Sequence, residues 1–443
     1  MRRNKAEFAL IAVLAGLALL VRYAGRREFT PDMRIFYVWY GKLDAAGGFR
    51  GLKQEIGNYN APFLYLLAAL TYLPGAVILK IKATWLLFDA LLVFFTFKIT
   101  ALRWPGWRVP ALAAAVVAVL PTVVVNSSFY GQCDAIWVAF TLGGLWLLLS
   151  GRDWWGVSLL TVALSVKPQA IFVFPLLLLL VLGGKVRWRA LLAVPVVYVL
   201  LDLPAIFAGR DAWELLTLYS PSRQARYVPA LTSNAASLWA FVPVTTRLDT
   251  LKTLGYLFAA ILVIGVIYTL IAARAELNAE RIVTAAAFFA VAIPFVLPGM
   301  HERYFYLADV LTLVLAIYRP RWWFVPLLVQ LASLLSYLPF LFEKAPHGPL
   351  VPLKLLATMM FAAVLTTGYA LIGDLRAGPR AAPPEPEIAP AEPEIAPAEP
   401  DIAPAEPEIA PAEPEIAPAE RVEAEPPISR PEARPELLRA HQA

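Results

Sequence analysis

Long apolar runs recur along this chain and limit the folds that are open to it. Runs of about 15 to 20 apolar residues suit α-helices that cross a bilayer, whereas barrel strands show short alternating segments. Segments such as Phe174-Pro-Leu-Leu-Leu-Leu-Leu-Val181 do not alternate, and only 16% of all residues are charged, against about 25% in soluble domains. The sequence therefore predicts an all-α polytopic membrane protein with about 12 to 14 transmembrane helices. We expect the spans at residues 8–23, 61–79, 83–101, 109–125, 135–149, 154–164, 170–182, 190–208, 251–273, 282–297, 303–318, 322–340 and 351–372.

Basic residues set the expected orientation of these spans. The first span follows Met1-Arg-Arg-Asn-Lys5 without a small-residue cleavage site, so we expect a retained anchor helix in the plasma or inner membrane with a cytoplasmic N-terminus. Further inner loops are indicated by basic clusters at residues 185–189, 274–281 and 319–321. The alternation fails once, because Lys80 with Lys82 and the basic residues at 98–108 cannot all be inside if every segment crosses. One segment between residues 61 and 101 is therefore a candidate re-entrant or partial span.

Residues 374–443 differ in kind from the rest. They hold 16 acidic and 6 basic side chains, whereas residues 1–373 hold 17 acidic and 32 basic ones. From Glu385 the unit Glu-Pro-Glu-Ile-Ala-Pro-Ala repeats five times, with Asp401 replacing one glutamate. Period seven is typical of a coiled coil, but two prolines per repeat exclude an α-helix. We expect a membrane domain at 1–373 and a disordered, acidic, Pro/Ala/Glu-rich cytoplasmic tail that serves as a spacer or weak docking segment.

Five polar patches fall on the predicted outer face. They are Asp32, Gln132 with Asp134, Lys167 with Gln169, the loop at 232–239 that contains Asn234 and Trp239, and His301-Glu302-Arg303. Each has a plain structural explanation: an Asp before a helix can cap it, a lysine can lie in a loop, and an arginine at a span end can snorkel. Their coincidence on one face favours a functional site, because carboxylates at membrane depth are costly unless they face a cavity.

The chemistry of these patches is that of proton and phosphate handling. The carboxylates can accept a proton, and Lys167, His301 and Arg303 can hold a phosphate, with Arg34 as a further candidate. The aromatic stretch at residues 35–40 suits a short interfacial helix, which would keep Asp32 near the membrane. The aromatic residues at 37–40 and 219–239 either stack on sugars or form an interfacial belt. The single cysteine, Cys133, excludes an internal disulfide.

Four motifs together resemble a known superfamily. They are Gly131-Gln-Cys-Asp-Ala-Ile-Trp137, Ser165-Val-Lys-Pro-Gln169, Asn234-Ala-Ala-Ser-Leu-Trp239 and Gly299-Met-His-Glu-Arg-Tyr304. This combination looks like the bacterial and archaeal relatives of GPI mannosyltransferase II. Through His-Glu-Arg it is also similar to the dolichyl-phosphate-glucose-dependent glucosyltransferases of N-glycan assembly. All are GT-C membrane glycosyltransferases, and the resemblance covers residues 1–372.

The resemblance implies a GT-C-type helix bundle whose outer loops form the active site. It implies inverting transfer of a hexose, with mannose expected first, from a polyprenyl-phosphate donor to a lipid-linked or cell-envelope glycan on the non-cytoplasmic face. An acidic residue of the first outer loop is the general base in such enzymes, and Asp32 occupies that place. Polyprenyl phosphate is a good leaving group, so the site needs a base and cations rather than a strong acid.

The remaining candidates are assigned to substrate binding. Gln132 and Asp134 would bind sugar or acceptor hydroxyls or orient the site, and Lys167, His301 and Arg303 would hold phosphate. Gln169, Asn234, Trp239 and Glu302 complete the candidate substrate-binding set.

Other classes of function are less well supported. Asp32 is followed by Met33 rather than by a second acidic residue, as in relatives of protein O-mannosyltransferases, so we expect no required metal. No Gly-x-Gly-x-x-Gly, Walker or Cys/His spacing indicates another cofactor, and the basic loops flank lipid spans, so nucleic acid is not expected as a partner. The rival hypotheses are a transporter or flippase of lipid-linked saccharides, which would show matching interrupted helices in two halves, and a scaffold without activity.

Overall fold

The computed structural model describes residues 2–224, 230–243, 247–341 and 351–375. The chain divides into two compact units, Met1–Arg380 and Ala381–Ala443. The second unit lies outside the described residues. The tail predicted at 374–443 is therefore described only in its first two residues, and the expected outer loop at 343–347 is not described.

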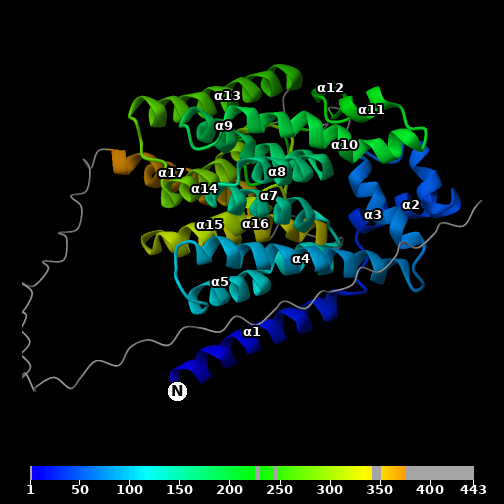
Figure 1. Cartoon of the computed structure of the whole chain (residues 1–443), viewed down its shortest axis with the longest axis horizontal. Coiled ribbons are helices and arrows are strands. Elements are labelled where there is room, and N and C mark those ends of the chain that lie inside the picture. Colours follow the sequence, from blue (N-terminus) through cyan, green and yellow to red (C-terminus); the bar gives the residue numbers. More distant parts are fainter. Residues whose placement is uncertain (1, 225–229, 244–246, 342–350, 376–443) are drawn as a thin grey trace, which may run out of the picture. The chain divides into compact units, whose positions relative to one another are not determined.

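Helices make up nearly all of the described structure (Figure 1). The first half contains α1 (Arg2–Gly25), α2 (Pro31–Ala45), α3 (Ala61–Thr71), α4 (Val77–Ala101), α5 (Arg108–Val119), α6 (Pro121–Val124), α7 (Asp134–Leu149), α8 (Asp153–Val166) and α9 (Phe174–Leu182). The second half contains α10 (Ala193–Phe207), α11 (Ala212–Thr217), α12 (Pro221–Gln224), α13 (Leu248–Ala272), α14 (Ala279–Val296), α15 (Tyr306–Tyr318), α16 (Val325–Leu341) and α17 (Leu353–Ile372). Two short strands, β1 (Thr232–Ser233) and β2 (Met300–His301), pair in parallel.

Several helices are long and apolar enough to cross a membrane. Six such segments are Ala6–Gly25, Trp188–Phe207, Leu248–Ala272, Ala279–Val296, Pro320–Leu341 and Leu353–Ile372. A seventh is the bent pair Arg108–Val119 and Pro121–Tyr130. The predicted all-α, multi-pass membrane architecture is thus confirmed within the described residues. The predicted number of 12 to 14 spans stays a prediction, because most of the remaining apolar helices have only 10 to 17 residues.

The region where the charge alternation failed contains one short helix and one long one. Helix α3 has 11 residues and α4 has 25, and at 1.5 Å per residue only the second approaches the length of a span. Lys80 and Lys82 lie in the first turns of α4, and both ammonium groups donate to backbone carbonyls. Both lysines are therefore bound within the protein.

The span predicted at 109–125 is bent in the structure. Pro121 follows Leu120, whose backbone is extended at φ −56°, ψ 125°, because the residue before a proline is disfavoured in the α region. The two arms of the bend meet at 51°. The second arm continues into a π-helical turn, Val125–Tyr130, which we call the π-turn. Gly131 ends it with φ +78°, a conformation that glycine adopts without strain.

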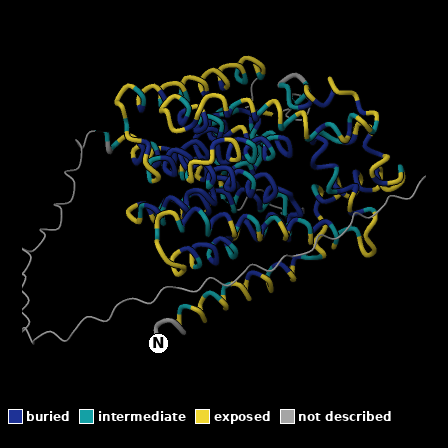
Figure 2. The backbone as a smooth tube through the Cα atoms, in the orientation of Figure 1, coloured by how far each residue is buried: buried dark blue, intermediate teal, exposed yellow. Residues whose placement is uncertain are grey.

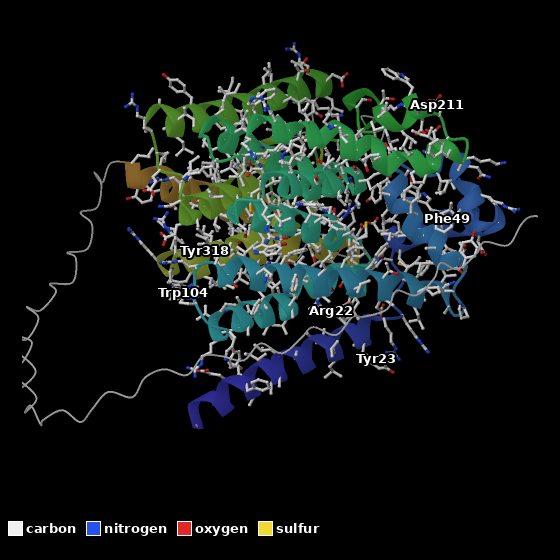
Figure 3. All side chains as sticks on the ribbon, viewed as in Figure 1. Arg22, Tyr23, Phe49, Trp104, Asp211 and Tyr318 are labelled. Carbon is white, nitrogen blue, oxygen red and sulfur yellow. The ribbon has the colours of Figure 1, made fainter. Side chains whose placement is uncertain are left out.

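The two ends of the bundle differ in their loops. The short loops at one end are basic, and side chains there link several helices: Arg103 to Glu280 at 2.8 Å, Arg108 to Glu7 at 3.1 Å, and Trp104 Nε1 to the Ile317 carbonyl at 3.0 Å. Figure 3 shows Trp104 and Tyr318 at this end, far from Phe49 and Asp211. Helices α2, α3, α11 and α12 gather at the other end (Figure 1).

The core lies in the helices that carry the polar patches. Of the Ala279–Val296 segment 83% is buried, against 17% of Ala6–Gly25, and Figure 2 shows the contrast between the buried middle helices and the exposed α1 and α13. Helices α7 and α8 approach closely at Gly144 and Gly156, because glycine has no side chain to keep the backbones apart. A Cβ on Gly144 would lie only 2.9 Å from the Gly156 carbonyl oxygen. This antiparallel pair brings the start of α7 and the end of α8 to the same end of the bundle.

Candidate functional site

A cavity of about 360 Å³ opens at the end opposite the basic loops. Six parts of the chain form its walls: the first half of α2, the loop before α3, the turn after the π-turn, the link between α8 and α9, the end of α12, and the loop before α15. It is lined by Asp32, Ile35, Phe36, Trp39, Gly57, Asn58, Tyr59, Gln132, Pro168, Gln169, Gln224, His301, Arg303 and Tyr304.

Asp32 is held in place by the way α2 begins. Thr30 is the N-cap, its Oγ1 accepts from the Met33 amide at 3.2 Å, and Pro31 occupies the first helical position, as is common for helix starts. The same Thr30 hydroxyl donates to the Tyr130 carbonyl at 2.5 Å. The first turn of α2 is thereby attached to the end of the π-turn. The predicted interfacial helix at residues 35–40 is part of α2.

The Asp32 carboxylate meets two donors at the edge of the cavity. Its Oδ2 lies 3.1 Å from Arg303 Nη1 and also accepts from the Gln132 side-chain amide. Within the described part of the chain these are its only polar side-chain contacts, and both are at Oδ2. The side chain keeps 19% exposure, so Oδ1 remains available to a ligand in the cavity.

Arg303 joins three carboxylates. Besides Asp32, its Nη1 lies 2.8 Å from Glu302 Oε1, and its Nε lies 3.9 Å from Asp134 Oδ2. Burial alone would lower the pKa of the guanidinium, but the carboxylates of Asp32 and Glu302 outweigh it and raise the pKa further. Arg303 therefore stays charged and is the centre of the network.

Glu302 is fully buried beneath Arg303. Its Oε1 accepts from the Tyr130 hydroxyl at 2.7 Å, and its Oε2 lies 3.6 Å from His301 Nδ1. Burial would raise the pKa of this carboxyl, but the Arg303 charge, the nearby His301 side chain and the hydrogen bond from Tyr130 lower it to about 2. Glu302 is therefore an anion that fixes the Arg303 guanidinium.

The low pKa of Glu302 predicts acid sensitivity of the fold. Between about pH 2 and 4.5 the unfolded chain binds a proton that the folded protein does not, so the stabilisation from Glu302 is complete above pH 4.5 and is lost as the pH falls towards 2. We expect the difference in unfolding free energy between wild type and Glu302→Gln to shrink by roughly 3 kcal/mol over this range. Glu280→Gln is the matched control, because Glu280 is 39% exposed and pairs at the surface. A difference that does not vary with pH in micelle unfolding experiments would contradict the assignment.

Asp134 and Lys167 form an enclosed ion pair. Lys167 Nζ lies 2.5 Å from Asp134 Oδ1, and the two side chains are 0% and 1% exposed. Trp137 Nε1 and Asn126 Nδ2 also donate to this carboxylate, at 3.1 and 2.9 Å. Lys167 does not line the cavity, so the structure gives it a different place from the phosphate contact expected from the sequence. It neutralises Asp134 instead.

The two glutamines of the site offer acceptors to the cavity. Gln132 and Gln169 both line it, and the side-chain carbonyl oxygen of each is buried without a hydrogen-bond partner among the described residues. Buried acceptors of this kind are normally satisfied.

Asn234 and Trp239 lie outside the cavity. Asn234 Nδ2 donates to the Ser336 carbonyl at 2.8 Å, and Trp239 Nε1 donates to the Val296 carbonyl at 2.8 Å. Their segment pairs with the loop before α15, with Thr232 opposite Met300 and Ser233 opposite His301. The structure therefore gives them a supporting position, in which they hold the loop that carries His301 and Arg303.

The remaining candidates differ in access. His301 lines the cavity and its side chain is 28% exposed. Arg34 is exposed on α2 and does not line the cavity. The aromatic loop predicted at 219–239 is described only in part, because residues 225–229 are outside the described set.

Several contributing residues were not identified from the sequence. Asn58 and Tyr59 line the cavity, and Asn126 and Tyr130 hold Asp134 and Glu302. The sequence contains a hint for three of them. Asn58 and Tyr59 directly precede an apolar segment, and Asn126 begins a polar stretch between two apolar segments. Trp39, one of the aromatic residues at 37–40 for which stacking on a sugar was one interpretation, also lines the cavity. Trp39 resembles any interfacial aromatic, and only packing distinguishes it.

An apolar groove of about 380 Å³ shares two segments with the cavity. Its walls are Ile171, Phe174, Pro175, Leu178, Ala259, Ala260, Val263, Ile293 and Leu297. Ile171 lies two residues after Gln169, and Leu297 lies four residues before His301. Polar and apolar binding surfaces are thus adjacent along the same two stretches of chain.

Among the described residues, no group of three or more His, Cys, Asp or Glu side chains is arranged to hold a metal ion. Compared with known protein families and with curated proteins, the sequence matches none of them.

Proposed function

We propose that this chain is a glycosyltransferase that transfers a hexose from a polyprenyl-phosphate donor to a hydroxyl of a lipid-linked or cell-envelope glycan. The observation that carries the proposal is the Asp32 carboxylate, which has one oxygen bound to Arg303 and Gln132 and the other open to a polar cavity. A carboxylate held in this way is oriented to accept a proton. The adjacent apolar groove suits the hydrocarbon part of the donor.

The proposed reaction is a single displacement. Asp32 Oδ1 accepts the proton of the acceptor hydroxyl while that oxygen attacks the anomeric carbon. The bond from this carbon to the phosphate oxygen breaks, and the electron pair leaves with polyprenyl phosphate. Attack opposite the leaving group inverts the anomeric configuration. Gln132 and Gln169 accept hydrogen bonds from sugar hydroxyls in this scheme.

Charge balance assigns the phosphate to one end of the cavity. The cluster contains two cations, Lys167 and Arg303, and three carboxylates, those of Asp32, Asp134 and Glu302. A phosphate therefore needs another positive group, because an unpaired charge is costly in a site of low dielectric. We assign the phosphate to His301, which lines the cavity together with Arg303. Lys167 acts at a distance, by neutralising Asp134.

The orientation of the bundle supports transfer on the non-cytoplasmic face. Basic residues in short loops mark the cytoplasmic side of a membrane protein, and such loops lie at the end opposite the cavity. The N-terminal end of α1 and the C-terminal end of α17 are at that basic end, through Glu7 and through the Ala370 carbonyl, which accepts from Arg319 at 2.8 Å. Both termini of the described chain are proposed to be cytoplasmic.

A transfer assay tests the proposal. The purified protein in lipid vesicles is incubated with radiolabelled polyprenyl-phosphate mannose or glucose and with membrane lipid extracts as acceptors. We expect label to enter an extractable glycan, with mannose preferred. Ala260→Phe, which fills the groove, should raise the KM for a long-chain donor about 10-fold and leave that for a short-chain donor unchanged.

Ile261→Phe is the matched control, because Ile261 lies next to Ala260 on α13 but outside the groove. Equal effects of the two variants would remove the groove from the proposal. Absence of transfer from every polyprenyl donor, together with saccharide movement across the vesicle membrane, would favour the transporter hypothesis instead.

A further inference from the structure

Helix α4 carries a buried polar stripe that contacts the π-turn. Lys82, Trp85 and Asp89 are three and four residues apart and so lie on one face of the helix. Lys82 Nζ donates to the Ser128 carbonyl at 2.5 Å, Trp85 Nε1 donates to the Gly131 carbonyl at 3.0 Å, and the Ser127 hydroxyl donates to Asp89 at 2.6 Å. All three side chains are nearly inaccessible to solvent.

These contacts satisfy the backbone at the end of the π-turn. The last carbonyls of a helix have no partner within it and need donors from elsewhere when they are buried. Here the carbonyls of Ser128, Tyr130 and Gly131 accept from Lys82, Thr30 and Trp85 respectively. The shape of this turn therefore depends on side chains from α4 and from the start of α2.

Lys82 also holds the segment that leads to Asp32. Its ammonium donates to the Gly25 carbonyl at 2.8 Å and to the Glu28 carbonyl at 2.6 Å. An ammonium has three N–H donors, and all three are used, two on the loop before α2 and one on the π-turn. One cation thus binds both the segment that leads to Asp32 and the π-turn that precedes Gln132 and Asp134.

A second tie lies one to two turns further along α4. Arg22 Nε lies 2.9 Å from Asp89 Oδ2, the same oxygen that accepts from Ser127. Figure 3 shows Arg22 pointing from α1 towards α4, whereas Tyr23 points away. Helix α1 and the π-turn are therefore both held against one face of α4.

We propose that Lys82, supported by Trp85 and Asp89, is a positioning residue that sets the geometry between Asp32 and the turn carrying Gln132 and Asp134. The inference rests on the proposed function in naming Asp32 as the base. Lys82 touches neither the cavity nor a ligand site, and it acts through the backbone of the two segments.

The chain contains its own reporter of this geometry. Cys133 is the single cysteine of the protein and lies within the turn at 0% exposure. Burial raises the pKa of its thiol to about 12, and the thiolate is the reactive form. A water-soluble maleimide should therefore modify the folded protein slowly. Loosening the turn should accelerate the labelling, whether or not the protein is an enzyme.

The test compares Lys82→Met with Lys80→Met. Lys80 is the matched control, because its ammonium also has three acceptors, the Leu70 and Leu73 carbonyls and the Tyr40 hydroxyl, and none of them belongs to the π-turn or to the chain between Gly25 and Glu28. For Lys82→Met we expect Cys133 labelling to rise about 10-fold and kcat in the transfer assay to fall about 10- to 100-fold with little change in donor KM. Lys82→Arg, which keeps the charge and donors, should restore much of both, and Lys80→Met should resemble wild type.

Unchanged labelling and kcat in Lys82→Met would overturn the inference, as would equal effects in Lys80→Met. If Lys82→Met does not fold, Trp85→Phe decides: it removes one N–H donor, and it should raise labelling and lower kcat in the same direction. Faster labelling in Lys82→Met, in a protein that transfers no sugar even as wild type, would uphold the positioning role and refute the proposed function.

Discussion

Replacing Asp32 with asparagine is expected to reduce kcat for sugar transfer by about 10²- to 10⁴-fold, the usual contribution of a positioned general base. Asparagine has nearly the same shape and can keep the contact with Gln132, but it cannot accept the proton of the acceptor hydroxyl. Donor binding should change little, because the groove and His301 are untouched. The measurement is single-turnover transfer with the preferred donor, together with the donor KM.

Asp44→Asn is the control for this variant. Asp44 lies near the other end of α2 and is exposed, so the same chemical change there should leave kcat unaltered. A kcat for Asp32→Asn within a few-fold of wild type would exclude Asp32 as the base. Asp134 and Glu302 are poor substitutes, since neither side chain lines the cavity and each is already paired with a cation, Lys167 or Arg303.

Replacing Lys167 with methionine is expected to destabilise the protein by about 3–5 kcal/mol, because it leaves Asp134 as a buried carboxylate without its nearest cation. The pair is separated by 2.5 Å and excluded from solvent. The double variant Lys167→Met/Asp134→Asn should recover most of this loss, since it removes both charges. Unfolding in mixed micelles, followed by tryptophan fluorescence, measures the differences.

Arg103→Met is the matched comparison, because Arg103 pairs with Glu280 at 2.8 Å and the two side chains are 43% and 39% exposed. Exposed pairs contribute about 0–1 kcal/mol, so this variant should be close to wild type. If Lys167→Met were equally mild, Asp134 would not be ionised in the folded protein, and the charge count that assigns phosphate to His301 would fail.

Much of the architecture follows from local sequence. Apolar length placed the helical segments, and the aromatic stretch at residues 35–40 indicated a short helix there. The helix begins earlier, at Pro31, with Thr30 rather than Asp32 as its N-cap. The unequal loop charges placed Asp32, Gln132, His301 and Arg303 at one end of the bundle. These features depend on neighbours in the chain, so a sequence is sufficient to predict them.

The roles within the site depend on distances across the fold. Lys167 and His301 are both cationic candidates in outer loops, yet one is enclosed against Asp134 and the other is open to the cavity. Asn234 and Trp239 belong to one motif, and nothing in its sequence indicates that both side chains lie outside the cavity. Lys82 and Asp89 were noticeable as charges in an apolar helix, but their partners lie up to 67 residues away.

The sequence by itself thus determined that the chain is a multi-pass helical membrane protein with polar groups gathered at one end. Only the tertiary structure decided which of these groups meet: Asp32 with Arg303, Lys167 with Asp134, and Lys82 with the π-turn. The physical reason is that helix formation and membrane insertion respond to composition over one to a few turns. Ion pairs and cavities depend instead on helices that are distant in sequence. Their side-chain atoms must come within about 3 to 4 Å of one another.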